Sequence, residues 1–173
     1  MKFRQFGLGL AMAGACLAAS CATTGGSGDP EARSWRKVTQ TANRFAVFIN
    51  EPGPARDGGL VTFRMVYVYM PGEVKFEEKE VAWQEYHAMT VNCADNTIRT
   101  GPRTRYAPDG SVLASDDNQE FSEILWGVAS DDAARAKCRQ DYWIGDITIP
   151  NGSNWMDAAR KHIAETTPPN RPL

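Results

Sequence analysis

Histidine is scarce in this chain, which contains only His87 and His162 among its 173 residues. A Ser-His-Asp triad needs a histidine, and neither histidine has zinc-finger spacing from a cysteine. The GxSxG, SxxK, HExxH and P-loop motifs are also missing. We therefore expect no cofactor, no metal and no catalytic site. A small hydrolase built on a histidine that the fold brings beside a carboxylate stays open as a less favoured alternative.

The chain also lacks an excess of basic charge, because it has 19 Lys and Arg residues against 21 Asp and Glu residues, a net charge of −2. Removal of residues 1–20 would take away Lys2 and Arg4 but no acidic residue, which changes the net charge to −4. Without a basic field we expect no nucleic-acid partner. The 153 residues that would remain of 173 suffice for one domain with its own core.

No apolar run is long enough for a membrane-spanning helix, which needs roughly 20 strongly apolar residues. The uncharged run from Gln5 to Ala22 is short, mildly apolar and interrupted by glycine, and it follows two basic residues. This pattern is typical of a cleaved signal peptide, which we place at residues 1–20.

Small residues precede Cys21 at the end of this run, in the sequence Leu-Ala-Ala-Ser-Cys. The pattern resembles the bacterial lipobox, in which the cysteine thiol is diacylated and becomes the new N-terminus. Residues 21–33 are rich in Thr, Gly and Ser, so we expect a flexible tether between a lipid anchor and the domain. By the sorting rule of enteric bacteria, Ala22 in place of aspartate implies the outer membrane, with its surface and periplasmic faces both open.

Two other interpretations of the leader are weaker. Cleavage before Cys16, which also follows small residues, would leave an apolar stub and a second cysteine at the new terminus. An ordinary secreted protein would keep Cys21 as a spare thiol, which is a liability in an oxidising compartment.

Only two of the four cysteines, Cys93 and Cys138, lie beyond the leader and the tether. Outside the cytoplasm an isolated pair is most simply one disulfide, and closing a loop of this length is worth roughly 4 kcal/mol. The sequence therefore predicts a Cys93–Cys138 bond.

Period-two patterns predict an antiparallel meander rather than alternating strands and helices. The strongest strand is Leu60–Met70, in which every second residue from Val61 to Tyr69 shares one face. The same period in Val81–Cys93 places Trp83 on the side of Met89. The other expected strands are Ser34–Thr41, Phe45–Asn50, Thr97–Tyr106, Ser111–Ser115 and Trp143–Ile149, and residues 73–80 read as a solvated connection.

Helical patterns occur only in the C-terminal third. Ser130 can cap a short helix that ends at Cys138, and a second helix begins near Ser153 or Asn154. We therefore predict an α+β fold at residues 34–165, with an antiparallel meander sheet of about six strands, one or two C-terminal helices packed on it and one disulfide. Residues 166–173 are expected to form a disordered tail.

Two sets of side chains allow two interpretations each. Arg99, Arg103 and Arg105 stand at alternate positions and are expected on one strand face, which meets either an anionic partner or, more simply, solvent. The aromatic residues of the second half belong to the core in the simpler interpretation and to a binding patch in the other. They are Trp83, Tyr86, Phe121, Trp126, Tyr142 and Trp143.

Six short motifs occur in a recognisable order. They are Ser34-Trp35, Phe48-Ile49-Asn50, the run VTFRMVYVY, Val91-Asn92-Cys93, the run RYAPDGSVL at 105–113, and Cys138 after a short helix. Together they resemble the surface-adhesin protein E family of small bacterial lipoproteins. The resemblance implies an antiparallel sheet with helix packed at one side, a disulfide and, for the member that gives the family its name, binding of host matrix proteins and plasminogen. No adhesive ligand-binding segment matches residue by residue.

The combined hypothesis is a non-enzymatic outer-membrane lipoprotein, anchored at Cys21, whose domain binds a protein or envelope ligand. The alternative is a periplasm-facing structural or assembly factor with the same fold. The ligand-binding residues are not predicted by any of these patterns.

Overall fold

We analyse a computed structural model, which describes residues 34–51, 56–57, 59–139, 147–149, 152 and 154–166. The expected signal peptide and tether, with Cys21, lie outside these residues. So do Tyr142, Trp143 and residues 167–173 of the expected tail.

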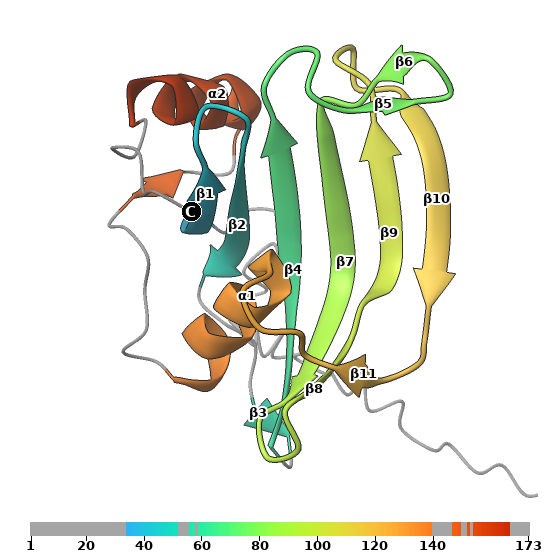
Figure 1. Cartoon of the computed structure of the whole chain (residues 1–173), viewed down its shortest axis with the longest axis vertical. Helices are drawn as coiled ribbons and strands as arrows, with labels where there is room; N and C mark the ends of the chain where they lie inside the picture. Colours follow the sequence, from blue (N-terminus) through green and yellow to red (C-terminus); the bar gives the residue numbers. More distant parts are fainter. Residues whose placement is uncertain are drawn as a thin grey trace, which may run out of the picture.

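One large antiparallel sheet forms the body of the domain (Figure 1). Its main path runs β10-β9-β7-β4-β2-β1-β12, so the six strands from β1 to β10 are neighbours in chain order, as a meander requires. This confirms the predicted α+β class with its antiparallel sheet. The strands of this path are β1 (Ser34–Thr41), β2 (Phe45–Glu51), β4 (Leu60–Tyr69), β7 (Trp83–Asn92), β9 (Gly101–Tyr106), β10 (Val112–Asn118) and β12 (Thr148–Ile149).

Short strands complete the structure. β3 (Arg56–Asp57) pairs with β4, while β8 (Thr97–Arg99) pairs with both β7 and β11 (Ser122–Glu123). The connection expected to be merely solvated forms a hairpin of β5 (Lys75–Phe76) and β6 (Lys79–Glu80). Glu77 and Glu78 form its turn with φ of 47° and 64°, values that no periodicity in the sequence signals.

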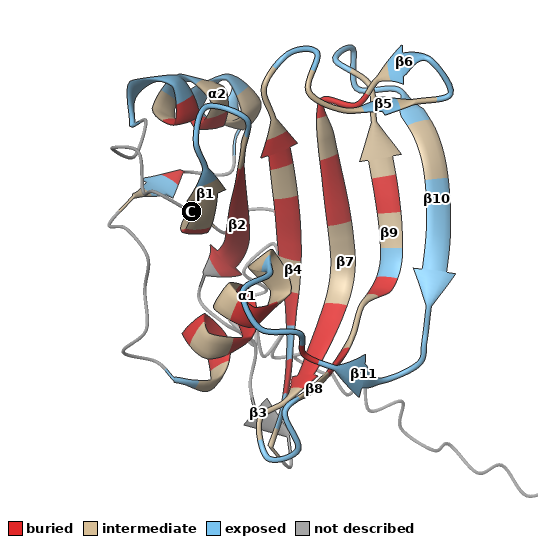
Figure 2. Cartoon of the chain, viewed as in Figure 1, coloured by how far each residue is buried: buried red, intermediate tan, exposed pale blue. Residues whose placement is uncertain are grey.

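Two helices cover opposite faces of the sheet, and alternate residues of β2 and β4 belong to two separate cores. Figure 2 shows that β2 and β4 are buried along much of their length. Helix α1 (Ala129–Cys138) packs on the face of Val61, Phe63 and Met65. Helix α2 (Trp155–Glu165) packs with Ala159 and Ile163 on the face of Val66 and Val68. Full burial of a side chain such as Ile163 is worth about 1.5–3 kcal/mol, so each helix is held by its apolar face.

Helix α1 begins two residues earlier than a Ser130 cap predicts, and Ser130 is not its cap. The N-cap is Val128, which has no side-chain capping hydrogen bond. Asp131 instead accepts a hydrogen bond from the Gly127 N–H at 3.1 Å, which satisfies a backbone donor just before the helix. The acidic third residue of the helix therefore fixes the segment that leads into it, and no side chain caps the first turn.

A β-bulge makes the predicted face of Trp83 wrong. Phe63 pairs with Met89 and Met65 with Tyr86, so three steps along β7 face two steps along β4. The extra residue shifts the alternation between the two halves of β7. Met89 therefore packs in the core under α1, whereas Trp83 packs in the core under α2.

The same irregularity separates Arg99 from Arg103 and Arg105, which were expected on one face. The strand opposite β7 is divided into β8 and β9, and Gly101 begins β9 with φ of 61°. Arg99 pairs with Thr90 and donates to its hydroxyl at 3.3 Å, while Arg103 pairs with Tyr86. Because of this break, only Arg103 and Arg105 share a face.

Candidate functional site

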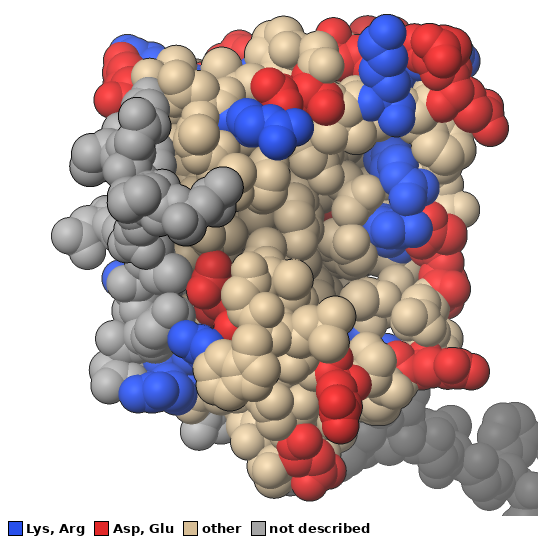
Figure 3. Space-filling view, in the orientation of Figure 1, with Lys and Arg blue, Asp and Glu red and all other residues tan. Residues whose placement is uncertain are grey.

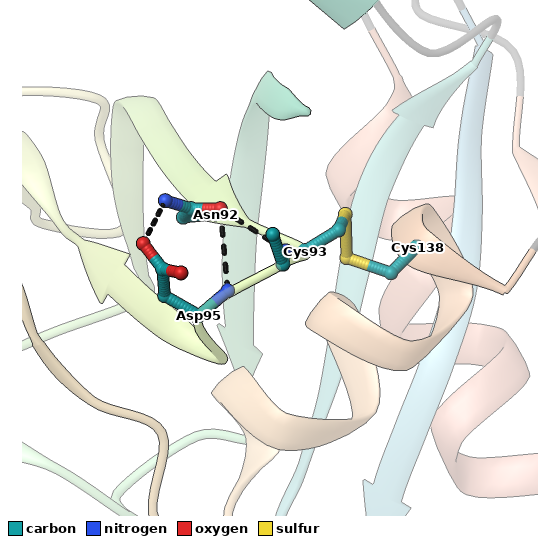
Figure 4. The surroundings of a disulfide bond; sticks show 5 residues. Asn92, Cys93, Asp95 and Cys138 are labelled. Atoms are coloured by element: carbon teal, nitrogen blue, oxygen red, sulfur yellow. Dashed lines mark hydrogen bonds between the residues drawn. A yellow bond between two sulfur atoms is a disulfide. The ribbon is translucent and has the colours of Figure 1, made fainter. Parts of the chain in front are cut away.

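The predicted disulfide is present between Cys93 and Cys138, with Cα atoms 5.5 Å apart (Figure 4). Cys93 directly follows β7 and Cys138 is the last residue of α1, so the bond ties the helix to the sheet. Asn92 shapes the turn beside it, accepting from the Ala94 N–H at 3.0 Å and donating to Asp95 at 2.6 Å.

A cavity of about 260 Å³ lies next to the disulfide. Val91, Ile124 and Ala134 contribute its apolar lining, and Asp131 and Arg135 are among the polar groups around it. Both cysteines and Trp126 also line the cavity. The disulfide thus fixes the two elements, sheet and helix, between which the cavity forms.

The segment Phe121–Val128, which we call the Trp126 loop, exposes large apolar side chains beside this cavity. Leu125 is 67% exposed and Trp126 is 76% exposed. The Arg135 guanidinium lies 4.5 Å from the centre of the Trp126 ring, and Arg135 forms an ion pair with Asp131 at 2.9 Å. The Arg135 guanidinium therefore packs on one face of the Trp126 ring, and the rest of the ring is exposed to solvent.

The core interpretation of the aromatic residues is wrong for this loop. Phe121 is 45% exposed and Trp126 is mostly exposed, whereas Trp83 stacks on Tyr106 with ring centres 4.5 Å apart. The segment falls between a polar strand and a helix, and no pattern in it marks Trp126 as exposed. Ile124 of the same segment is buried.

A second polar and aromatic surface occupies the α1 side of the sheet, beyond the end of that helix. We call it the tyrosine–arginine floor and define it by residues at alternate positions of three neighbouring strands. They are Tyr67 and Tyr69 of β4, Gln84 and Tyr86 of β7, and Arg103 and Arg105 of β9. Figure 3 shows uncharged side chains over the middle of this face, with basic side chains over β9 and acidic ones over β10.

Asp116 of β10 links the two arginines of the floor. It accepts from Arg103 at 2.8 and 2.6 Å and from Arg105 at 3.1 Å. The hydrogen bond from Arg103, together with both positive charges, lowers the pKa of Asp116 below its usual value. Asp116 is thus part of an ion-pair network that links β10 to β9.

The tyrosines of the floor are neutral hydrogen-bonding groups. Burial raises the pKa of Tyr69 to about 12, and burial and then Tyr86 raise that of Tyr67 further. Gln84 Nε2 donates to the Tyr86 hydroxyl at 2.9 Å. At neutral pH these phenols therefore both donate and accept.

His87 lies on the opposite face of the sheet, half-exposed, in the bulged part of β7. Its Nε2 is 2.9 Å from the Thr104 hydroxyl, and its Nδ1 is 3.5 Å from Glu85. Glu85 is also paired with Arg64. The order hydroxyl, imidazole, carboxylate is that of a catalytic triad, which the spacing of these residues did not signal.

An oxyanion hole is the part that this constellation lacks in the described residues. Thr104 is only 8% exposed and lies inside β9, which is paired with β7 on one side and β10 on the other. The N–H groups around it point along the sheet to neighbouring strands instead of toward a substrate.

His162 is a packing residue of α2. Lys37 Nζ lies 2.8 Å from its Nε2, and since an ammonium group only donates, the imidazole is neutral and accepts. Burial, followed by the nearby positive charge of Lys37, lowers the pKa of His162. The structure thus does not bring the two histidines together, because His87 contacts Thr104 of β9 and His162 contacts Lys37 of β1.

The described residues contain no group of three or more His, Cys, Asp or Glu that could hold a metal ion. Among the same residues, no helix has the length and apolar character needed to cross a bilayer. Cys21 lies outside the part that the structure describes, so its lipidation stays a prediction.

Comparison with known proteins gives no match to a family model, a curated protein or a solved structure. The resemblance to the surface-adhesin protein E family therefore stays a prediction based on the motifs quoted above.

Proposed function

We propose that this chain is a non-enzymatic outer-membrane lipoprotein, similar to surface-adhesin protein E, whose domain binds a protein partner through the Trp126 loop. The observation that carries the proposal is the 76% exposure of Trp126 beside the cavity next to the disulfide. Exposed tryptophan next to arginine is typical of the residues that dominate the energy of protein interfaces.

The size of the cavity favours a protein over a small molecule. Its 260 Å³ is below the roughly 300–1,000 Å³ of typical small-molecule pockets and suits one large side chain of a partner. The disulfide and the sheet hold its walls in place, so binding would order few groups and would cost little conformational entropy.

Crosslinking on intact cells tests the contact. A photoreactive phenylalanine analogue at position 126 should give a discrete protein adduct, because this position would lie at the centre of the interface. The same analogue at Val112, which is 59% exposed on β10, is the matched control and should give none. Equal labelling from both positions, or none from either, would contradict the proposed contact.

Protease treatment of intact cells tests which side of the membrane the domain faces. Digestion without breaching the outer membrane supports the surface-exposed, adhesin-like version. Complete protection until the membrane is breached would rule out the adhesin-like version. It would favour the periplasm-facing structural or assembly factor, which would bind its partner through the same Trp126 loop.

The Thr104–His87–Glu85 chain is the one observation that favours a hydrolase as a second candidate. Incubation of the purified domain with short-chain aryl esters tests it. Turnover that His87→Gln abolishes while the fold is retained would replace the non-enzymatic proposal, and turnover equal to that of the variant would remove the hydrolase.

A further inference from the structure

Five of the six residues of the tyrosine–arginine floor, together with Asp116 of β10, form two parallel rows of side chains, and each row crosses three strands. In the first row Tyr67 pairs with Gln84, and Gln84 with Arg105. In the second row Tyr86 pairs with Arg103, which pairs with Asp116. Neighbouring strands are about 4.8 Å apart, so each row spans roughly 10 Å, the size of one or two sugar rings.

Five of the six floor residues are half-buried, Gln84 is 8% exposed, and two elements border this surface. Helix α1 ends the floor on one side and the β5–β6 hairpin lies at the other (Figure 1). Phe76 of this hairpin packs over Arg105 with its ring centre 5.2 Å from the guanidinium. On β10, Arg105 pairs with Ala114, which has a small side chain.

The charges of the floor favour a ligand that places one negative charge on it. Arg103 and Arg105 carry two positive charges, and Asp116 balances one of them. Arg103 binds Asp116 through two nitrogens, but Arg105 binds it through one, and a guanidinium has five N–H donors. A carboxylate can therefore bind Arg105 without removing Asp116 from Arg103.

The uncharged part of the floor favours a sugar over a peptide. β4, β7 and β9 each have hydrogen-bonded neighbours on both sides, so an extended peptide cannot add to the floor as a further strand. Neutral phenols and an amide, which donate and accept, match the hydroxyl groups of a sugar. The aromatic rings, with Tyr67 and Tyr69 centred 6.2 Å apart, offer apolar surface to the C–H face of a sugar ring.

We propose that the tyrosine–arginine floor binds an acidic sugar, with the sugar carboxylate on Arg105 and the sugar ring over Tyr67, Gln84 and Tyr86. The site lies on β4, β7 and β9, apart from the Trp126 loop, and does not depend on the protein-binding function proposed above.

Calorimetric titration of the purified domain with oligogalacturonic acid tests the proposal, with the fully methyl-esterified oligomer as the matched neutral ligand. The acid should bind and the ester should bind at least tenfold more weakly, since a charge-assisted hydrogen bond contributes about 1.5–3 kcal/mol. No binding of the acid at millimolar concentration, or equal binding of acid and ester, would overturn it. Equal binding of polyglutamate of the same length would replace the sugar by an acidic protein segment.

Four variants separate a ligand contact from a structural role. Arg105→Gln should weaken binding of the acid about tenfold or more, and Tyr86→Phe should weaken it several-fold. Arg44→Gln removes an exposed arginine that is paired with Glu73 outside the floor, and it should change nothing. Asp116→Asn should strengthen binding several-fold, because it removes the carboxylate that competes for Arg105.

The Asp116→Asn result distinguishes the two roles most sharply. If the network only holds β9 to β10, loss of Asp116 weakens or leaves unchanged any binding, and that outcome would overturn the assignment of Arg105 as the carboxylate contact. Thermal unfolding of each variant shows whether the fold is retained.

Discussion

Gly101→Ala is the substitution that we expect to damage this fold most for its size. A Cβ atom at position 101 would lie 2.4 Å from the carbonyl oxygen of Ala88, a backbone atom of the bulged part of β7. The residue also has φ of 61°, which costs an L-residue roughly 1–2 kcal/mol. Overpacking against backbone adds about 1–3 kcal/mol, so the unfolding free energy should fall by about 2–5 kcal/mol.

Gly72→Ala is the matched control. Gly72 has φ of 80°, and a Cβ there would meet no atom within 4 Å, so this variant measures the conformational cost alone. Urea unfolding should show a lower midpoint for both variants with an unchanged slope, and a fall about 1–3 kcal/mol larger for Gly101→Ala. Equal losses for the two variants would refute the close approach of Gly101 to β7.

Three further changes test the disulfide, the α2 contact and the anchor. Replacement of Cys93 and Cys138 by serine should lower the unfolding free energy by about 4 kcal/mol, because the bond closes a loop of 45 residues, and thiol labelling of the native protein should find both blocked until reduction. The folded pKa of His162 is lowered by burial and then by Lys37, so the unfolding free energy should fall as the pH drops below about 6.5. His162→Gln should flatten this dependence, and an unchanged pH profile would contradict the contact. Cys21→Ala should release the protein from membranes in fractionation while the domain stays folded, and continued retention would count against lipidation.

The period-two runs made the strand order of this fold predictable, because antiparallel neighbours joined by short turns must pair in chain order. The disulfide was predictable because Cys93 and Cys138 had no other partner in the domain. The faces of β7 and β9 were not predictable, since one extra residue near His87 shifts the alternation and no propensity marks it. That shift placed Trp83 in the core under α2 and separated Arg99 from Arg103.

The candidate sites were also predictable only in part from the sequence. From the sequence, Trp126 could be a core residue or part of a binding patch, and Arg105 could face an anionic partner or solvent. Which alternative holds depends on what the rest of the chain covers. Trp126 is exposed because the loop before α1 places Ile124, and not Trp126, in the core beside the alanines of this helix. Arg105 faces Tyr67 across Gln84 because the strand register brings them into one row.

By itself, the sequence determined what depends on local pattern: the strands of the meander, the two helices, the single cysteine pair and the expectation of an anchor at Cys21. Only the tertiary structure decided which side chains meet, because a bulge in β7, a positive φ at Gly101 and helices on opposite faces act between segments far apart in the chain. These contacts create the cavity beside the disulfide and the two rows of the tyrosine–arginine floor.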